Sequence, residues 1–463
     1  MLMSFSEAVD KYFRLTERGT DPKTELKGAL LVFLSMSYIL VVNPGMMADA
    51  GMDQNACYTA TVLITIFGCL VMGLYANYPV AQAPAMGINA FFVYTVVITM
   101  GYQWDTALFA VFLSGIIFFL ISMSSLRTKF LNAIPDSLRR GIAAGIGCFI
   151  VLIGLNNAGV IVSNVSTLVQ LGDLSDPAVL LSLFCLSVTI IMSARKMKLA
   201  IFWGMLLTAI VGIIIGVIAV PGSLFATPEP PNFGNFLEGF HPEIFDLNFV
   251  MIIISFVFVI FFDSTGTLMA LSDRAGIGLG SNELNVELES NRLNAEEIAD
   301  VKSREKGLRK AFMSDAAATT LSGVVGSTPC SSYAESSVGI ESGSRTGLMA
   351  VFVAMFFFIA LFVGPLFSVI DFHCTVGAMF MVGVAMVTEL RKVDWSDQCI
   401  AISVLSTILF MVLTYSITNG IAFGIIMYCL AMIGAGRARE VNKGIYVVAI
   451  ISLAYFLATA FNY

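Results

Sequence analysis

Long apolar stretches recur along the whole chain, and they constrain its fold more than any other feature of the sequence. A helix needs roughly 17–25 mainly apolar residues to cross the hydrocarbon core of a bilayer. Of the 463 residues, 57% are hydrophobic and only 12% are charged, whereas soluble domains carry roughly 25% charged residues. The sequence therefore predicts an all-α polytopic membrane protein. Predicted spans lie near 28–49, 56–76, 85–102, 105–124, 134–157, 177–193, 198–220, 248–272, 311–326, 346–370, 372–390, 398–416, 418–434 and 444–461.

The distribution of basic residues predicts the topology. A short apolar piece at 334–343 is too brief to cross alone, and counting it as a half-membrane helix gives fourteen elements before 444–461. Basic residues then gather in the N-terminal tail and after even-numbered elements, for example at Arg139, Arg195 and Arg437. Because Lys and Arg mark cytoplasmic loops, we expect a multi-pass protein of the cell inner (plasma) membrane with a cytoplasmic N-terminus. The segment 444–461 either crosses as a fifteenth element or lies along the surface.

Two ionisable residues stand well inside predicted membrane elements. Asp263 lies deep in the apolar run FVFVIFFDSTGTLMAL, and Glu335 begins the short element in SSYAESSVG. Carboxylates within spans are costly and mark substrate or proton pathways by default, the alternative being a polar group satisfied by a neighbouring helix. Four further acids lie nearer the predicted span ends, where we expect them at the membrane interface: Asp315, Asp371, Glu341 and Glu389.

Two stretches, 77–92 and 326–343, have the pattern of helices broken within the membrane. Pro79 and Pro84 exclude a regular helix through the first, and Pro329 with a run of Ser and Thr opens the second. Each is predicted to be an extended segment followed by a half-helix. Because irregular backbone at membrane depth must be satisfied by protein or a water-filled cavity, we expect the two extended segments to pair as an antiparallel two-stranded unit. Matched breaks in two halves point to an inverted-repeat transporter.

The matched breaks also predict the domain organisation. The first repeat, spans 1–7, occupies 28–220, and the second, spans 8–14, occupies 248–434. A cytoplasmic tail, 1–27, precedes them, and a C-terminal segment with an extra apolar helix, 435–463, follows. A charged insertion at 274–310 in the second repeat is expected to form a solvated cytoplasmic helix pair. Its alternative role is a regulatory docking site.

The half-helices suggest a binding site near the membrane midplane, because their N-termini carry free N–H groups and a partial positive charge. The first begins with Gly87 and Asn89, and the second with Glu335 and Ser336. Backbone N–H groups suit the acceptors of a flat heterocycle, and two carboxylates with an Asn amide suit its donors. An aromatic side chain could stack on the ring face. The predicted substrate-binding residues are Asp263, Glu335, Asn89, Gly87, Tyr333, Ser336 and Thr267.

Other chemistries find little support in the sequence. The two histidines, His241 and His373, are far apart, and the eight cysteines show no paired spacing, so neither a metal site nor another cofactor is expected. Gly141, Gly145 and Gly147 resemble a nucleotide-binding loop, but they follow no strand and fit close helix packing better. The sequence has no Walker motif and no serine triad. An intramembrane enzyme that uses two carboxylates is the enzymatic alternative.

At these residues the chain resembles the nucleobase permeases of the xanthine/uracil permease superfamily, and within it the adenine/guanine/hypoxanthine permease subgroup. The resemblance covers nearly the whole chain and is carried by TELKGALLVFLSMSYILVVNP, APAMGINAFF, IPDSLRRGIAAGIGCFIVLIGL, FFDSTGTL and YAESSVGIESGSRTGL. It implies two inverted seven-span repeats, with spans 1–4 and 8–11 forming a core domain and spans 5–7 and 12–14 a gate domain. The chain departs from related patterns at Ile260, often a second Asp, and at Ser327–Ser332, usually Thr-rich.

The resemblance further implies where the substrate binds. It places the substrate between core and gate, held by the acidic residues of spans 8 and 10, which here are Asp263 and Glu335. The polar residue of span 3 falls on Asn89, and the aromatic residue two places before the span-10 acid falls on Tyr333.

Residues and resemblance together predict a secondary active transporter that imports a purine nucleobase (adenine, guanine or hypoxanthine). Proton symport with an elevator-like alternating-access mechanism is expected, with the proton as the coupling ion. The alternative is an anion transporter or exchanger of the same broad fold, for sulfate or bicarbonate, although two acids at the half-helix ends would repel an anion. The expected partners are the purine base and the lipid bilayer, not nucleic acid, and a homodimer stays open.

The two acids are the candidates for proton coupling. Apolar surroundings disfavour the charged form of Asp263, whereas the half-helix end favours the charged form of Glu335. We therefore expect the protonation of Asp263 to matter for transport and Glu335 to anchor the substrate. The opposite assignment stays open.

Overall fold

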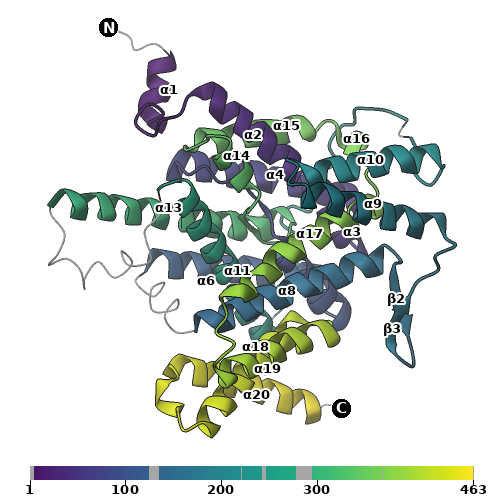
Figure 1. The fold of residues 1–463 in the computed structure, drawn as a ribbon, viewed down its shortest axis with the longest axis vertical. Helices are drawn as coiled ribbons and strands as arrows, with labels where there is room; N and C mark the ends of the chain where they lie inside the picture. The colour runs from purple at the N-terminus through teal and green to yellow at the C-terminus, as the bar shows by residue number, and fades with distance from the viewer. Residues whose placement is uncertain are drawn as a thin grey trace.

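The computed structural model describes residues 5–124, 135–220, 222–241, 247–277, 295–367 and 369–461, and it is mostly helical (Figure 1). Among these residues, seven helices are long and apolar enough to cross a membrane, and five shorter apolar helices accompany them. The prediction of an all-α polytopic membrane protein is therefore confirmed.

The helices follow the predicted order along the chain. Those of the first half are α1 (Phe5–Phe13), α2 (Pro22–Met36), α3 (Ile39–Asp49), α4 (Gln54–Val71), η1 (Met72–Ala76), α5 (Met86–Ala90), η2 (Phe91–Thr99), α6 (Trp104–Met123), α8 (Asp136–Asn157), α9 (Pro177–Ala194) and α10 (Ala200–Ile214). Those of the second half are α11 (Leu247–Arg274), α13 (Ala295–Val325), α14 (Ser336–Glu341), α15 (Leu348–Ala360), α16 (Gly364–Phe367), η6 (Phe372–Cys374), α17 (Val376–Val387), η7 (Thr388–Lys392), α18 (Gln398–Leu413), α19 (Ile417–Gly434) and α20 (Lys443–Phe461).

Aspartate caps begin several of these helices. Asp21 accepts hydrogen bonds from the backbone N–H groups of Lys23 at 2.9 Å and Thr24 at 3.2 Å, and Pro22 occupies the first helical position. A side-chain cap with proline at this position strongly favours a helix start. As a result, the first span begins at residue 22, before the predicted start at 28. Asp176 caps α9 and Asp397 caps α18 in the same way.

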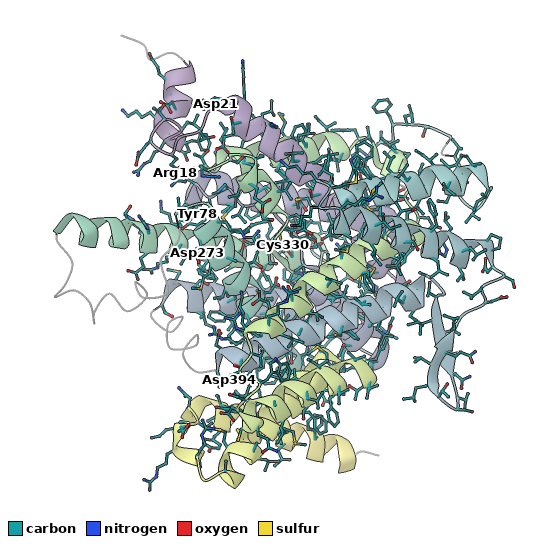
Figure 2. The ribbon with its side chains drawn as sticks, in the orientation of Figure 1. Arg18, Asp21, Tyr78, Asp273, Cys330 and Asp394 are labelled. Carbon is teal, nitrogen blue, oxygen red and sulfur yellow. The ribbon has the colours of Figure 1, made fainter. Side chains whose placement is uncertain are left out.

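The two predicted membrane breaks are present, and they pair with each other. β1 (Gln82–Pro84) and β4 (Cys330–Ser332) are antiparallel, with Gln82 opposite Ser332 and Pro84 opposite Cys330. Backbone hydrogen bonds of 2.9 Å from Ala85 to Pro329 and from Tyr333 to Ala81 extend the pairing. A half-helix follows each strand, α5 after β1 and α14 after β4. Cys330 lies in the middle of the bundle (Figure 2) and is fully buried.

The helices pack in two groups. In the first, α4 contacts α3, α13 and α15, α6 contacts α11 and α13, and α2 contacts α14 and α15. In the second, α8 contacts α17 and α18, α9 contacts α10 and α17, and α19 contacts α18 and α20. Figure 1 shows α18, α19 and α20 together at one end of the molecule. These groups have the memberships expected for a core and a gate domain, whereas the repeat boundaries at 28–220 and 248–434 stay a prediction.

Glycines let the gate helices approach closely. A Cβ on Gly141 of α8 would lie 2.9 Å from a methyl of Val404, and one on Gly147 would lie 2.8 Å from the carbonyl oxygen of Gly383. Contacts this short leave no room for a side chain. The glycines of α8 therefore pack helices, as predicted.

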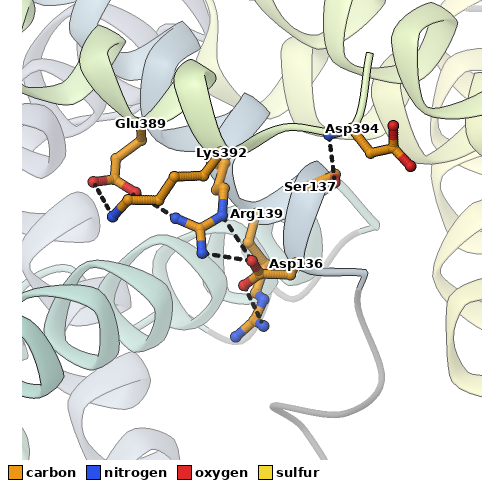
Figure 3. A network of polar contacts seen from close by, with 7 residues as sticks. Asp136, Ser137, Arg139, Glu389, Lys392 and Asp394 are labelled. Carbon is orange, nitrogen blue, oxygen red and sulfur yellow. Dashed lines mark hydrogen bonds and ion pairs between the residues drawn. The ribbon is translucent and has the colours of Figure 1, made fainter. Parts of the chain in front are cut away.

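Ion pairs join the gate elements at the end where the basic residues gather (Figure 3). Arg140 lies 2.6 Å from Asp136 and 2.5 Å from Glu389, and Arg139 lies 2.8 Å from Asp136. Lys392 also pairs with Glu389, at 3.1 Å. The beginning of α8 is thereby tied to η7, across a wide separation in sequence.

Several features differ from the predictions or extend them. The segment between the predicted spans 134–157 and 177–193 contains a hairpin of β2 (Ile161–Asn164) and β3 (Leu168–Leu171). α10 ends at Ile214, earlier than the predicted 220. Part of the 274–310 insertion is the beginning of α13, while 278–294 lies outside the described residues. The C-terminal apolar segment is a helix, α20, that packs on α19.

Candidate functional site

A cavity of about 460 Å³ lies between the two packing groups, a size within the range of roughly 300–1,000 Å³ that is typical of small-molecule sites. The core side is formed by α5, α11 and the β4–α14 segment, and the gate side mainly by α8 and α17. Its lining consists of Tyr38, Ala85, Met86, Gly87, Ile88, Ile146, Ile150, Ile201, Val259, Asp263, Thr267, Ala270, Leu271, Arg274, Ser331, Ser332, Tyr333, Ala334, Glu335, Ser337, Val338, Met381, Val382, Ala385 and Met386.

Asp263 projects from α11 to the cavity beside the paired strands. Its Oδ2 accepts a hydrogen bond of 2.7 Å from the hydroxyl of Ser331 in β4. The helix residues before it, including Ile260 and Phe261, are fully buried in the core. Apolar packing of α11 therefore fixes the position of the carboxylate, and a strand hydroxyl orients it.

Glu335 lies at the N-cap position of α14 and lines the same cavity. Its Oε1 accepts a hydrogen bond of 2.6 Å from the phenol of Tyr38, at the junction of α2 and α3. The Tyr38 ring is buried and tilted beside Tyr333, with the ring centroids 6.4 Å apart. Sequence reasoning missed Tyr38, because an aromatic residue in an apolar span carries no sign of its distant partner.

Asp315, expected at a membrane interface, lies instead in the interior behind the strands, so that expectation is wrong. The side chain is fully buried, and α13 continues well beyond it to Val325. Its Oδ1 accepts hydrogen bonds from Ser332 of β4, at 2.8 Å, and from the amide of Gln82 of β1. Asp315 thus joins the two strands from the side of α13. By contrast, Asp371 and Glu341 are exposed, as expected.

Three further predicted site residues line the cavity. Gly87 faces Ile146 of the gate so closely that a Cβ there would overlap a methyl of that side chain. Thr267 follows Asp263 by one helical turn on α11. Tyr333 lines the cavity with its ring, while its hydroxyl donates a hydrogen bond of 2.7 Å to the carbonyl of Pro84.

Asn89 and Ser336, also predicted to bind substrate, are fully buried and do not line this cavity. The Asn89 Oδ1 accepts a hydrogen bond of 2.6 Å from Thr328. The Ser336 hydroxyl accepts one of 2.9 Å from the backbone N–H of Ala81. In this conformation both side chains support the strand segments rather than face the cavity.

The contact region between the core and gate helices has different residues at its two ends. On one side the cavity reaches Arg274, which forms an exposed pair with Glu341 at 3.5 Å. At the other end, Tyr94 of the core donates to Asp49 at 2.7 Å and accepts from Asn157 of the gate at 2.6 Å. These hydrogen bonds join the core to the gate at the Asn157 end.

The carboxylates of Asp263 and Glu335 lie at the cavity, and the guanidinium of Arg274 lies at its exposed end. The rest of the lining is largely aliphatic. Such a cavity suits a flat ligand that presents N–H donors to the carboxylates and apolar faces to the walls. A second cavity of about 690 Å³, lined by Asp49 and Tyr58 among others, contains none of the predicted site residues. Within the described residues, no group of three or more His, Cys, Asp and Glu side chains could hold a metal ion.

The chain is similar in sequence to known permeases. The model of the Permease family for xanthine and uracil permeases matches residues 23–285 and 293–423. The guanine/hypoxanthine permease PbuG of Bacillus subtilis is 38% identical over 458 residues, covering 96% of this chain and 99% of that protein. The adenine permease AdeP of Escherichia coli is 35% identical over 443 residues, covering 96% of this chain and 94% of that protein.

The fold also has a counterpart among solved structures. The transmembrane domain of the cyanobacterial bicarbonate transporter BicA superposes with a TM-score of 0.60, covering 86% of this chain and 97% of that chain. The two sequences are 17% identical. At this identity the likeness concerns the fold alone.

Proposed function

The chain belongs to the xanthine/uracil permease family and to its adenine/guanine/hypoxanthine permease subgroup, and from this premise we propose that it imports a purine nucleobase by proton symport. It is a multi-pass membrane transporter and not an enzyme. Nucleobase transport follows from the family. The purine substrate, the coupled proton and the alternating-access mechanism are the proposed parts.

The observation that carries the purine assignment is the pair of carboxylates at an otherwise largely apolar cavity. Ser331 donates to one oxygen of Asp263, and Tyr38 donates to one oxygen of Glu335. The second oxygen of each carboxylate is the acceptor that we assign to a purine N–H group. Aliphatic side chains of the gate, such as Ile146 and Ile150, then cover the face of the ring.

An anion carrier is the second candidate, because the bicarbonate transporter shares the fold. The charged groups of the lining argue against it. Asp263 and Glu335 would face the ligand, whereas Arg274 stands at the mouth in a pair with Glu341. Carboxylates in a partly dehydrated cavity repel sulfate or bicarbonate. The purine therefore fits the site better than the anion.

Proton coupling is supported by the same carboxylates. An uncharged purine is not driven by the membrane potential by itself, so its accumulation needs a coupled ion. A protonatable group in the cavity can supply that coupling. We assign the proton to Asp263 and substrate anchoring chiefly to Glu335, because a partner tyrosine already orients Glu335.

Alternating access is supported by the division into core and gate. The cavity lies between the two packing groups and reaches the exposed Arg274 at one end, while at the other end of the contact between core and gate Tyr94 accepts a hydrogen bond from Asn157. We propose an elevator-like movement of the core against the gate that reverses these ends. We propose that the Arg274 end faces the cytoplasm, because basic residues mark cytoplasmic loops, and that the protein lies in the inner membrane of the cell.

Uptake into a strain that lacks its own permeases tests the proposed function. Radiolabelled adenine, guanine, hypoxanthine, xanthine, uracil and sulfate are compared, with and without a protonophore. We expect protonophore-sensitive uptake of at least one of adenine, guanine and hypoxanthine. Uptake of sulfate without any purine would contradict the proposal, and purine uptake that the protonophore leaves unchanged would contradict the coupling.

A further inference from the structure

The hydroxyl of Tyr38 makes the shortest described contact to the carboxylate that we assign as the substrate anchor. Its hydrogen bond to Glu335 Oε1 is 2.6 Å long. Tyr38 itself is 1% exposed, so the ring has little freedom to move. A hydroxyl that donates to a charged carboxylate at this distance forms one of the stronger kinds of hydrogen bond in proteins.

Within the described residues, the other support of the Glu335 carboxylate is local and comes from its own backbone N–H group. Glu335 is the N-cap residue of α14, yet its side chain makes no capping hydrogen bond to that helix. The other tyrosine of the cavity is already engaged, since the Tyr333 hydroxyl donates to the carbonyl of Pro84. A glutamate side chain has several rotatable bonds, and holding it in one rotamer has an entropic cost. The contact with Tyr38 is therefore the hydrogen bond that ties this carboxylate to another span and orients it across the cavity.

We propose that Tyr38 is a positioning residue, which holds the Glu335 carboxylate so that its second oxygen meets the N–H group of a purine. This inference rests on the proposed function and deepens it. Tyr38 comes from the first span and Glu335 from the tenth, so the anchor is assembled from both halves of the chain. The junction of α2 and α3 at Ser37 and Tyr38 places the phenol at the cavity.

A double-mutant cycle with Tyr38→Phe and Glu335→Ala tests the proposal, because Glu335→Ala removes the acceptor of the Tyr38 hydroxyl. The protein is purified in detergent, and binding of radiolabelled adenine, guanine and hypoxanthine is measured. In the wild-type background, Y38F should weaken purine binding about 3- to 10-fold, because Glu335 must then be ordered on binding, at the cost of immobilising one flexible side chain. In the E335A background, Y38F should change binding less than about 2-fold, because Tyr38 acts through the carboxylate.

Tyr58→Phe is the matched control. Tyr58 also lies in the core, and its hydroxyl donates to the carbonyl of Ala360 at 2.7 Å, but it does not line the substrate cavity. Y58F should leave purine binding unchanged. In uptake assays Y38F should raise KM and leave the maximal rate largely intact, whereas a folding defect would lower the maximal rate instead. This measurement decides the question if E335A binding is too weak to quantify.

The outcomes separate the two proposals. Wild-type protein that binds none of the purines overturns the proposed function and this inference with it. If the wild-type protein binds a purine, either of two results overturns the role of Tyr38 alone. Y38F weakens binding equally in both backgrounds, or Y38F does not weaken binding in the wild-type background. A Y38F effect confined to the maximal rate likewise shows a structural role and refutes the positioning role.

Discussion

A methyl group added at Gly87 should obstruct the contact between core and gate. Gly87 of α5 faces α8 across the cavity, and a Cβ there would overlap Cγ2 of Ile146, with the next neighbouring atoms at ordinary distances of 3.8 and 3.9 Å. Ile146 is β-branched and lies within α8, where one χ1 rotamer is strongly preferred, so its Cγ2 cannot turn away without cost. Overpacking of this kind costs about 1–3 kcal/mol. Gly87→Ala should therefore disfavour the observed conformation about 5- to 150-fold.

The assay compares initial purine uptake at equal expression with the thermal midpoint of the purified protein. Gly87→Ala should lower both, and the second substitution Ile146→Leu, which removes the overlapping Cγ2 at nearly constant volume, should restore much of the loss. Gly266→Ala is the control, because a Cβ there meets nothing within 4 Å. Unchanged behaviour of Gly87→Ala, or an equal loss in Gly266→Ala, would refute the reasoning.

Three further predictions concern coupling, topology and acid stability. Asp263→Asn should abolish pH-driven accumulation of purine in cells but retain exchange in proteoliposomes, and unchanged concentrative uptake would contradict the coupling role. A cysteine at exposed Lys306 should react only with cytoplasmic reagents and one at exposed Ser166 only from outside, whereas reversed labelling would overturn the topology. A 2.6 Å hydrogen bond from Arg437 holds the pKa of Asp397 below its ordinary 3.8. The contribution of Asp397 to the free energy of unfolding should be complete above pH 3.8 and should be lost as the pH falls through the lower pKa of the folded state. The thermal midpoints of wild type and Asp397→Asn should therefore converge only in strong acid.

The membrane breaks could be predicted because their cause is local. Pro79, Pro84 and Pro329 cannot sit within a regular helix, and backbone freed from helical hydrogen bonds inside a membrane needs protein partners. The two broken segments satisfy each other through the pairing of β1 and β4. The helical, multi-pass character of the chain was likewise predictable, since hydropathy is read directly from the residues.

The contacts that hold the site residues in place could not be predicted, because they join residues that are far apart in the sequence. Asp315 was wrongly predicted at a span end because α13 begins within the polar insertion. The apolar part of the helix, from which the span was predicted, begins only a few residues before Asp315. Tyr38 meets Glu335 only after the first and tenth spans pack together. Asn89 has the residue type for ligand binding, yet its side chain does not line the cavity and its amide oxygen accepts a hydrogen bond from Thr328. Composition shows which residues are able to bind, while only packing shows which of them face the cavity.

Direct binding to the purified protein tests the central claim most directly, namely that a purine binds at the cavity of Asp263 and Glu335. Wild type, Glu335→Gln and the control Tyr58→Phe are equilibrated with a radiolabelled purine in detergent, with excess unlabelled purine or sulfate as competitor. The account predicts saturable binding in wild type and the control, displaced by purine but not by sulfate, and strongly weakened in Glu335→Gln. Displacement by sulfate, or equal purine binding in Glu335→Gln and wild type, would contradict it.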